Sequence, residues 1–135
     1  GEVLEIYNLK DSTHVVRIGP HGEPKFKVAE GYGIPTGIMG FCDVQVTDSA
    51  IYAVFQGRTF KDIAEATQRG DMTDGGWYVY VFSLEGEPLR KYELDHAIYG
   101  MFVDGQFRTL VVVDINKDEP MVKFCCNKEK YTLGK

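Results

Sequence analysis

The segment Trp77–Phe82, WYVYVF, is apolar or aromatic at every position. Successive side chains of a β-strand point to opposite faces of the sheet, so both faces of this strand must be covered by other parts of the protein. Gly86 suits the left-handed position of a short hairpin loop, and Pro88 places the following strand at a sheet edge, because proline cannot donate to a ladder. The pattern predicts a hairpin that joins a central strand, covered by a neighbouring sheet on each side, to the outermost strand of its own sheet.

Short strand-like runs make up most of the chain. They are aromatic or β-branched and are bounded by Gly, Asp, Asn or Pro. The predicted strands are Val3–Leu9, His14–Ile18, Lys25–Ala29, Phe41–Thr47, Ile51–Gln56, Trp77–Phe82, Leu89–Leu94, Ile98–Asp104, Thr109–Ile115, Met121–Cys126 and Tyr131–Leu133. Small sheets that stack face to face are typical of propeller blades. We therefore predict an all-β fold of four-stranded antiparallel β-propeller blades.

The connection over residues 58–76 is too long for a hairpin loop and predicts an insertion with one short helix. Four of its residues recur at the spacing of one helical face: Phe60, Ile63, Ala64 and Thr67. Thr59 can cap this helix, with Asp62 three residues later, and Gly70 can end it.

A repeat supports the blade prediction. His14–Val28 and Tyr78–Leu94 each contain an apolar strand, a loop ending in Gly-Glu-Pro and a strand with alternating charge, and Met121–Lys135 is a looser third copy. Without the insertion, the first two copies are about 46 residues apart, which fits a four-stranded blade. We predict a single partial propeller unit over residues 1–135 with about three blades: an incomplete three-stranded blade at 1–34, a blade with the insertion at 35–95, and a blade at 96–135.

Three blades do not close a ring, since closed propellers usually need at least four. The chain is therefore predicted to be half of a six-bladed ring, completed either by the remainder of a longer protein or by a second copy in a homodimer. The net charge of −5 argues against a nucleic-acid partner. No apolar run is long enough to be a transmembrane segment.

The residues that carry chemistry form no catalytic or cofactor-binding signature. Asp43 opens an inner strand and is a weak candidate for a metal ligand at the central channel. Cys125 and Cys126 are adjacent in a strand, so their thiols are expected on opposite faces, as inert side chains rather than redox or catalytic groups. Three aromatic residues are candidates for a binding surface: Phe60, Tyr32 and Tyr99.

The segments IYAVFQGRTF (Ile51–Phe60), VYVFSLEGEPLRKYELD (Val79–Asp95), IYGMFVD (Ile98–Asp104) and EPMVKF (Glu119–Phe124) resemble the TolB-like six-bladed propeller lipoproteins of Bacteroides-type bacteria. The resemblance covers 37–124 and implies a propeller exported to the bacterial cell envelope, at the periplasm or the outer-membrane surface, often as a lipoprotein.

Together these observations favour a non-catalytic envelope propeller that acts as a binding or scaffold module for a protein, peptide or glycan. No cofactor is expected. Two alternatives remain open at the level of sequence: a metal-assisted propeller hydrolase or lyase of the calcium type, and a purely structural half-ring with no site of its own.

Overall fold

The structure, a computed structural model, describes residues 1–71, 75–105 and 109–125. Its strands are β1 (Val3–Asn8), β2 (Thr13–Ile18), β3 (Phe26–Ala29), β4 (Tyr32–Pro35), β5 (Phe41–Val46), β6 (Ile51–Phe55), β7 (Gly76–Phe82), β8 (Pro88–Ile98), β9 (Gly100–Asp104), β10 (Thr109–Val113) and β11 (Met121–Cys125). The helix is α1 (Phe60–Gln68). The all-β prediction with one short helix is confirmed, while the predicted strand Tyr131–Leu133 lies outside the described residues.

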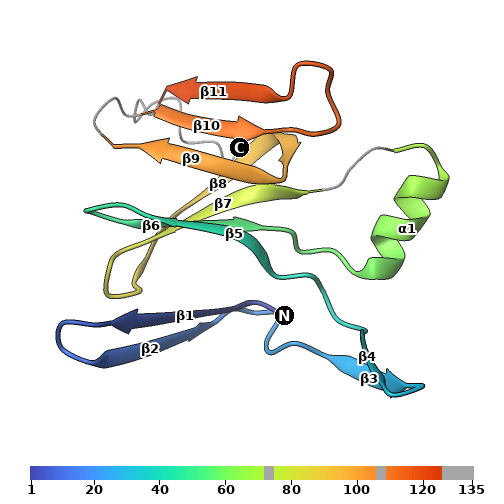
Figure 1. The fold of residues 1–135 in the computed structure, drawn as a ribbon, viewed down its shortest axis with the longest axis horizontal. Coiled ribbons are helices and arrows are strands. Elements are labelled where there is room, and N and C mark those ends of the chain that lie inside the picture. Colours follow the sequence, from blue (N-terminus) through green and yellow to red (C-terminus); the bar gives the residue numbers. More distant parts are fainter. Residues whose placement is uncertain (72–74, 106–108, 126–135) are drawn as a thin grey trace.

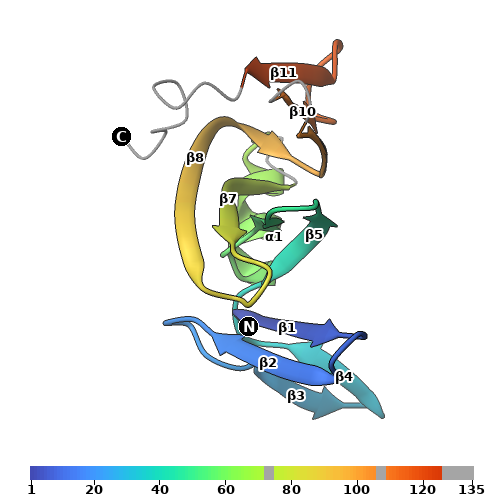
Figure 2. The ribbon, with the colours of Figure 1, turned by 90° about the vertical axis from the view of Figure 1, so that its left-hand side faces the viewer.

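All strand pairs are antiparallel and form four small sheets. The largest is β5-β6-β7-β8, in chain order, and β9-β10-β11 form a second sheet in the same manner. The β5–β8 sheet lies between the β9–β11 sheet and the β1–β2 hairpin, whereas the β3–β4 hairpin projects from the stack (Figures 1 and 2). Small antiparallel sheets stacked in this way are partial propeller blades.

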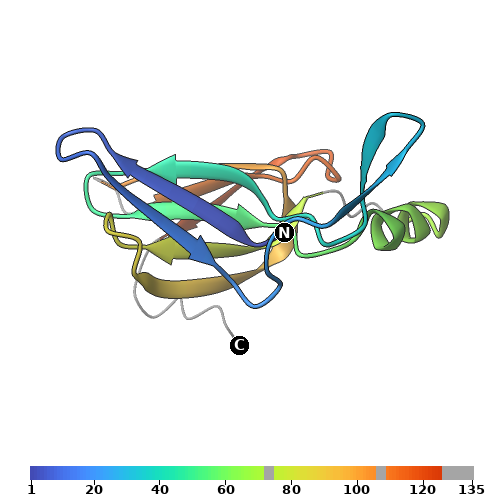
Figure 3. The same ribbon diagram turned by 90° about the horizontal axis from the view of Figure 1, so that it is seen from below.

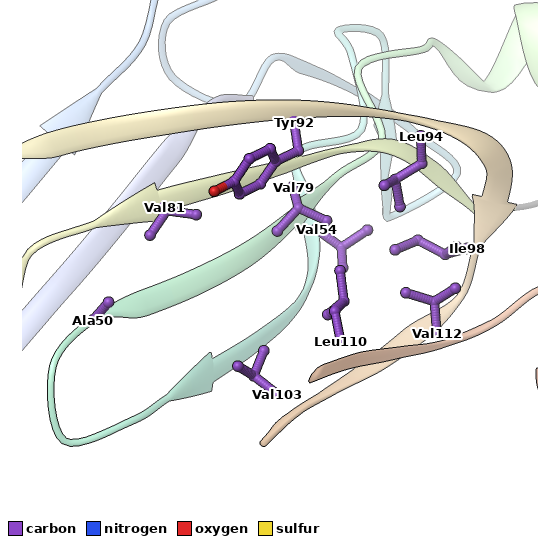
Figure 4. Packing of buried hydrophobic residues seen from close by; sticks show 10 residues of the cluster. All are labelled: Ala50, Val54, Val79, Val81, Tyr92, Leu94, Ile98, Val103, Leu110 and Val112. Carbon is purple, nitrogen blue, oxygen red and sulfur yellow. The ribbon is translucent and has the colours of Figure 1, made fainter. Parts of the chain in front are cut away.

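The β7 strand is covered on both faces, as its sequence predicts. Val79 and Val81 face the β9–β11 sheet and share a buried cluster with Leu110 and Val112 (Figure 4). On the opposite face, Phe82 packs in a second buried cluster with residues that include Leu4 of β1. Burial on both faces makes β7 the centre of the three-sheet stack.

The β8 strand is the outer edge of this sheet, as predicted. Gly86 has a φ of 87° in the hairpin loop that precedes it. Tyr92 and Leu94 are buried against the β9–β11 sheet, and the charged residues between and before them are exposed. The strand is longer than predicted, because Ile98 pairs with Gly76 of β7 and so remains in this sheet; β9 begins only after Tyr99.

The prediction that Lys25–Ala29 completes a three-stranded first unit is wrong. The β3 strand pairs with β4, not with β2. Glu30 and Gly31 have φ values of 52° and 81°, so the two residues form a tight hairpin turn that folds the chain back onto β3.

The β1–β2 hairpin instead resembles the β7–β8 hairpin in its sequence and packing. LEIYNL (Leu4–Leu9) and VYVFSL (Val79–Leu84) place apolar residues at matching positions. Leu4 packs against the neighbouring β5–β8 sheet, and Val79 in turn packs against the neighbouring β9–β11 sheet. The predicted blade limits at 1–34, 35–95 and 96–135 stay predictions.

Because successive strands run in opposite directions, every second connection lies at the same end of the stack. The connection from β2 to β5 carries the β3–β4 hairpin, and the connection from β6 to β7 carries α1. Figure 3 shows both insertions at the same end. We call this end the connection face; the tight turns β1–β2, β5–β6 and β7–β8 lie at the other end.

The inner strands of neighbouring sheets are joined by side chains of β5. The Asp43 Oδ2 atom accepts a hydrogen bond from the Met101 backbone N–H at 2.9 Å. Gln45 makes two bonds with Val103: its Oε1 accepts from the backbone N–H at 2.8 Å, and its Nε2 donates to the carbonyl at 3.1 Å. We call these contacts the inner clasp; through it, β5 side chains satisfy backbone groups of β9.

Replacing Gln45 by alanine is expected to lower the free energy of unfolding by about 1–3 kcal/mol, because it leaves the buried Val103 backbone groups without partners. Urea denaturation measures this change. Gln68→Ala, at the exposed end of α1, is the matched control and should change stability by no more than about 0.5 kcal/mol. Equal effects of the two substitutions would contradict a stabilising inner clasp.

Candidate functional site

The helix on the connection face begins with the predicted capping box. The Thr59 Oγ1 atom accepts a hydrogen bond from the Asp62 backbone N–H at 3.1 Å, and the Asp62 carboxylate accepts from the Thr59 N–H at 2.9 Å. These bonds satisfy backbone donors that the first helical turn leaves free. At the other end, Gly70 has a φ of 79° and ends the helix as expected. Both ends of α1 are therefore determined by local sequence.

Hydrogen bonds at its base fix the helix insertion to the blade. The Arg58 guanidinium donates to the Gln56 side-chain oxygen and to the Gly75 carbonyl, which are on opposite sides of the insertion. Gly75 has a φ of 117°, and an added Cβ would lie 2.4 Å from the Ile98 carbonyl oxygen. Glycine is therefore required where the chain re-enters β7.

A second set of bonds joins the base of the insertion to the start of β5. Met39 donates to the Arg58 carbonyl at 2.7 Å and accepts from the Gly57 N–H at 2.9 Å, while the Gln56 N–H donates to the Gly40 carbonyl at 2.9 Å. The two segments form a short strand-like ladder, which keeps the approach to β5 next to the helix.

A cavity of about 440 Å³ opens between the helix, this ladder and the junction of β8 with β9. We call it the helix cleft. Its lining consists of mainly apolar residues with a few polar groups: Met39, Gly40, Phe41, Cys42, Gln56, Phe60, Ile63, Thr67, Gly75 and Tyr99. Clefts of this size, with apolar walls and few polar groups, are typical ligand sites.

Two of the three predicted binding residues lie in the helix cleft. Phe60, at the first position of α1, is 49% exposed, and Tyr99 is 57% exposed. Tyr32 lies on β4 of the projecting hairpin and does not line the cleft. From sequence, Phe60 on the predicted helix and Tyr99 in the predicted strand Ile98–Asp104 were singled out as aromatic residues, but there was no signal for Gln56 and Met39. Their place in the cleft arises from contacts between distant segments, and the role of all these residues in binding stays a prediction.

Asp43, the weak metal candidate, lies outside this cleft and belongs to the inner clasp. Its Oδ2 atom is bonded to the Met101 N–H, a structural role that sequence did not reveal. Within residues 1–71, 75–105 and 109–125, no three His, Cys, Asp or Glu side chains are grouped as metal ligands. The side chains of Cys125 and Cys126 lie outside the described part of the chain, so the opposite-face prediction stays a prediction.

A second cavity on the connection face, of about 340 Å³, is polar and contains His96. The buried Asp114 carboxylate, 2% exposed, accepts a hydrogen bond from His96 Nδ1 at 3.0 Å. It also accepts from the Asn116 backbone and side-chain nitrogens at 3.0 and 2.9 Å. None of the described lining residues carries a hydroxyl or a thiol. The His96–Asp114 hydrogen bond joins the end of β8 to the connection after β10.

The pKa of the Asp114 carboxyl is set by opposing effects. Burial acts to raise this pKa, but the hydrogen bonds from His96 and Asn116 outweigh it, and the pKa lies below its ordinary value of 3.8. A folded-state pKa below the unfolded value means that the carboxylate stabilises the fold above about pH 3.8. That contribution is lost as the pH falls through the lower, folded-state pKa.

Asp114→Asn is expected to lower stability at neutral pH by about 1–3 kcal/mol, because it removes the charge that His96 and Asn116 hold in a buried site. The difference from the unchanged protein should shrink as the pH falls from about 3.8, where the carboxyl of the unfolded chain takes up its proton, through the lower folded-state pKa. Urea denaturation across this pH range measures both. Asp118→Asn, an exposed aspartate in the same connection, is the control. A difference that is constant with pH would contradict the role of the carboxylate.

Comparison with known proteins gives a family match. A family model described as TolB-like 6-blade propeller-like matches residues 1–106. No curated protein and no solved structure matches the chain. In the described ranges, no helix combines the length and the apolar character that crossing a membrane requires.

Proposed function

The chain belongs to the TolB-like 6-blade propeller-like family, and from that premise we propose that it is a non-catalytic binding module that holds a segment of another protein in the helix cleft. The observation that carries the proposal is that two exposed aromatic side chains, Phe60 and Tyr99, line the same cavity. Aromatic side chains in a partly enclosed cavity are the groups that most often dominate binding energy. A propeller supplies the rigid support that such a site needs.

Location in the bacterial envelope, at the periplasm or the outer-membrane surface, is part of the proposal. It is supported by family membership and by the resemblance to Bacteroides-type lipoproteins. Peptide segments of secreted or surface-bound proteins would be within reach of the connection face there.

A displayed library of random linear peptides, selected on the purified protein, tests this function. We expect selected peptides to bind Phe60→Ala at least about tenfold more weakly, because the truncated side chain no longer covers their apolar anchor. Leu89→Ala removes a similarly exposed apolar side chain, 54% exposed on β8 outside the cleft, and should bind them unchanged. A glycan array is screened in parallel.

Failure to select any peptide would overturn the proposal, as would peptides that bind both variants equally. A glycan whose binding depends on Phe60 would replace the protein segment as the ligand class and would also contradict the proposal.

A scaffold function is favoured by a separate observation, the apolar outer faces of the two end sheets. Val16 on β2 and Tyr7 on β1 are exposed on one face, and Phe102 and Met121 on the other. Exposed apolar patches at both ends of a stack mark surfaces that other sheets cover. We propose that the isolated 135-residue chain pairs with a second copy, in which each end face meets the opposite end of the partner and a six-bladed ring closes.

Light scattering of the purified chain is expected to give the mass of a dimer. Val16→Lys and Phe102→Glu each place a charge in one of the two predicted contacts, so each should give a monomer at the same concentration. Leu89→Glu, outside both faces, should remain dimeric. A monomeric unchanged chain would contradict ring closure by a second copy, and cleft binding would be unaffected by that result.

A further inference from the structure

Gln56 is the most deeply buried polar residue of the helix cleft, with 7% of its surface exposed. Its backbone N–H is bonded to the Gly40 carbonyl. Its side-chain oxygen accepts hydrogen bonds from Arg58, at 3.2 Å from Nε and 3.1 Å from Nη2. Two guanidinium donors on this oxygen determine the amide orientation, since the NH₂ group cannot accept them.

The Gln56 Nε2 atom is therefore turned away from Arg58, and the residue lines the cleft. Among the described residues, no acceptor lies within hydrogen-bond distance of this nitrogen. An amide donor in so buried a position loses much of its hydration when a ligand covers the cleft. A ligand that fills the cleft must therefore bring an acceptor to Nε2 or leave the donor unpaired.

We propose that Gln56 Nε2 donates a hydrogen bond to a main-chain carbonyl of a bound peptide, next to a large apolar side chain that packs between Phe60 and Tyr99. This inference rests on the proposed function, because it specifies how the helix cleft recognises its peptide ligand. Gln56 thus determines where the main chain lies, and the aromatic walls determine which side chain is accepted.

The other polar groups of the cleft floor support a peptide over a sugar. The Met39 N–H and carbonyl and the Gly40 carbonyl are bonded in the ladder, and the Thr67 hydroxyl donates to the Ile63 carbonyl at 2.9 Å. A sugar ring presents hydroxyls around its whole edge, and each one buried without a partner weakens binding. An apolar side chain with one adjacent carbonyl matches the buried Gln56 donor among mainly apolar lining residues.

Arg58 is the positioning residue of this arrangement. It holds the Gln56 oxygen and the Gly75 carbonyl with one guanidinium group, so the amide is oriented before any ligand arrives. A donor that is already oriented loses little conformational entropy on binding. The proposed bond from Gln56 Nε2 therefore selects peptides whose main-chain carbonyl lies at one defined position in the cleft.

The test uses peptides from the displayed library that bind the protein and depend on Phe60. Gln56→Glu keeps an oxygen for Arg58 but replaces the donor by a second acceptor, so affinity for these peptides should fall at least about tenfold. Gln68→Glu makes the same chemical change on the exposed end of α1 and should leave affinity unchanged. Thermal denaturation verifies that both variants are folded.

A second measurement uses the unchanged protein and does not depend on how Gln56→Glu folds. Each peptide bond of a selected peptide is replaced in turn by an ester, whose carbonyl is a weaker acceptor. One position is expected to weaken binding to the unchanged protein severalfold, and where Gln56→Glu is folded, that effect should disappear in the variant.

The outcomes separate the inference from the function on which it rests. Peptides that depend on Phe60, bind Gln56→Glu as tightly as the unchanged protein and show no sensitive ester position would overturn the role of Gln56 alone. Peptides that do not depend on Phe60 would overturn the proposed function of the cleft itself. Loss of affinity in Gln68→Glu equal to that in Gln56→Glu would assign the effect to added charge and would also overturn the inference.

Discussion

The whole structure depends on the need to cover a strand that is apolar on both faces. Val79 and Val81 on one side of β7, and Phe82 on the other, can be removed from water only if a sheet lies over each face of β5–β8. The stack of three sheets satisfies this need. Alternating strand directions then bring every second connection to one end, where α1 and the β3–β4 hairpin both lie. The hydrophobic requirement of one strand thus determines where the candidate site is built.

Local sequence was sufficient wherever a short segment determines its own structure. The apolar or aromatic character of every residue in Trp77–Phe82 predicted the middle strand, and the Thr59–Asp62 pair predicted the helix start. The predicted pairing of Lys25–Ala29 with the first hairpin was wrong, because it was based on the repeated Gly-Glu-Pro and not on the weaker turn signal at Glu30-Gly31. Glutamate is an unusual residue at a positive φ, so this hairpin turn has no strong sequence signature.

The site was only partly predictable, for a physical reason. Phe60 and Tyr99 stand out because they are large aromatic residues on a surface helix and near a blade-to-blade junction, where a binding surface can form. Gln56 looks like the polar end of a strand, and nothing near it in sequence shows that Arg58 would bind its oxygen and leave its nitrogen in the cleft. Asp43, the weak metal candidate, holds a backbone N–H of the next sheet, a contact that the sequence did not indicate. Both depend on contacts across sheets, which spacing alone does not encode.

Phe60 and Tyr99, which both line the helix cleft, are attached to different sheets. Phe60 is in the insertion of the β5–β8 sheet, whereas Tyr99 leads into β9 and is held by its N–H to the Val113 carbonyl at 2.8 Å. A peptide between them adds a contact across the same junction that Asp43 and Gln45 hold at the inner strands. A ligand that requires contacts with both Phe60 and Tyr99 binds only when the two sheets are stacked. Such a ligand therefore stabilises the stacked arrangement relative to one in which the sheets are separated. Conversely, loosening the inner clasp must weaken the cleft, although none of the clasp residues contributes a side chain to it.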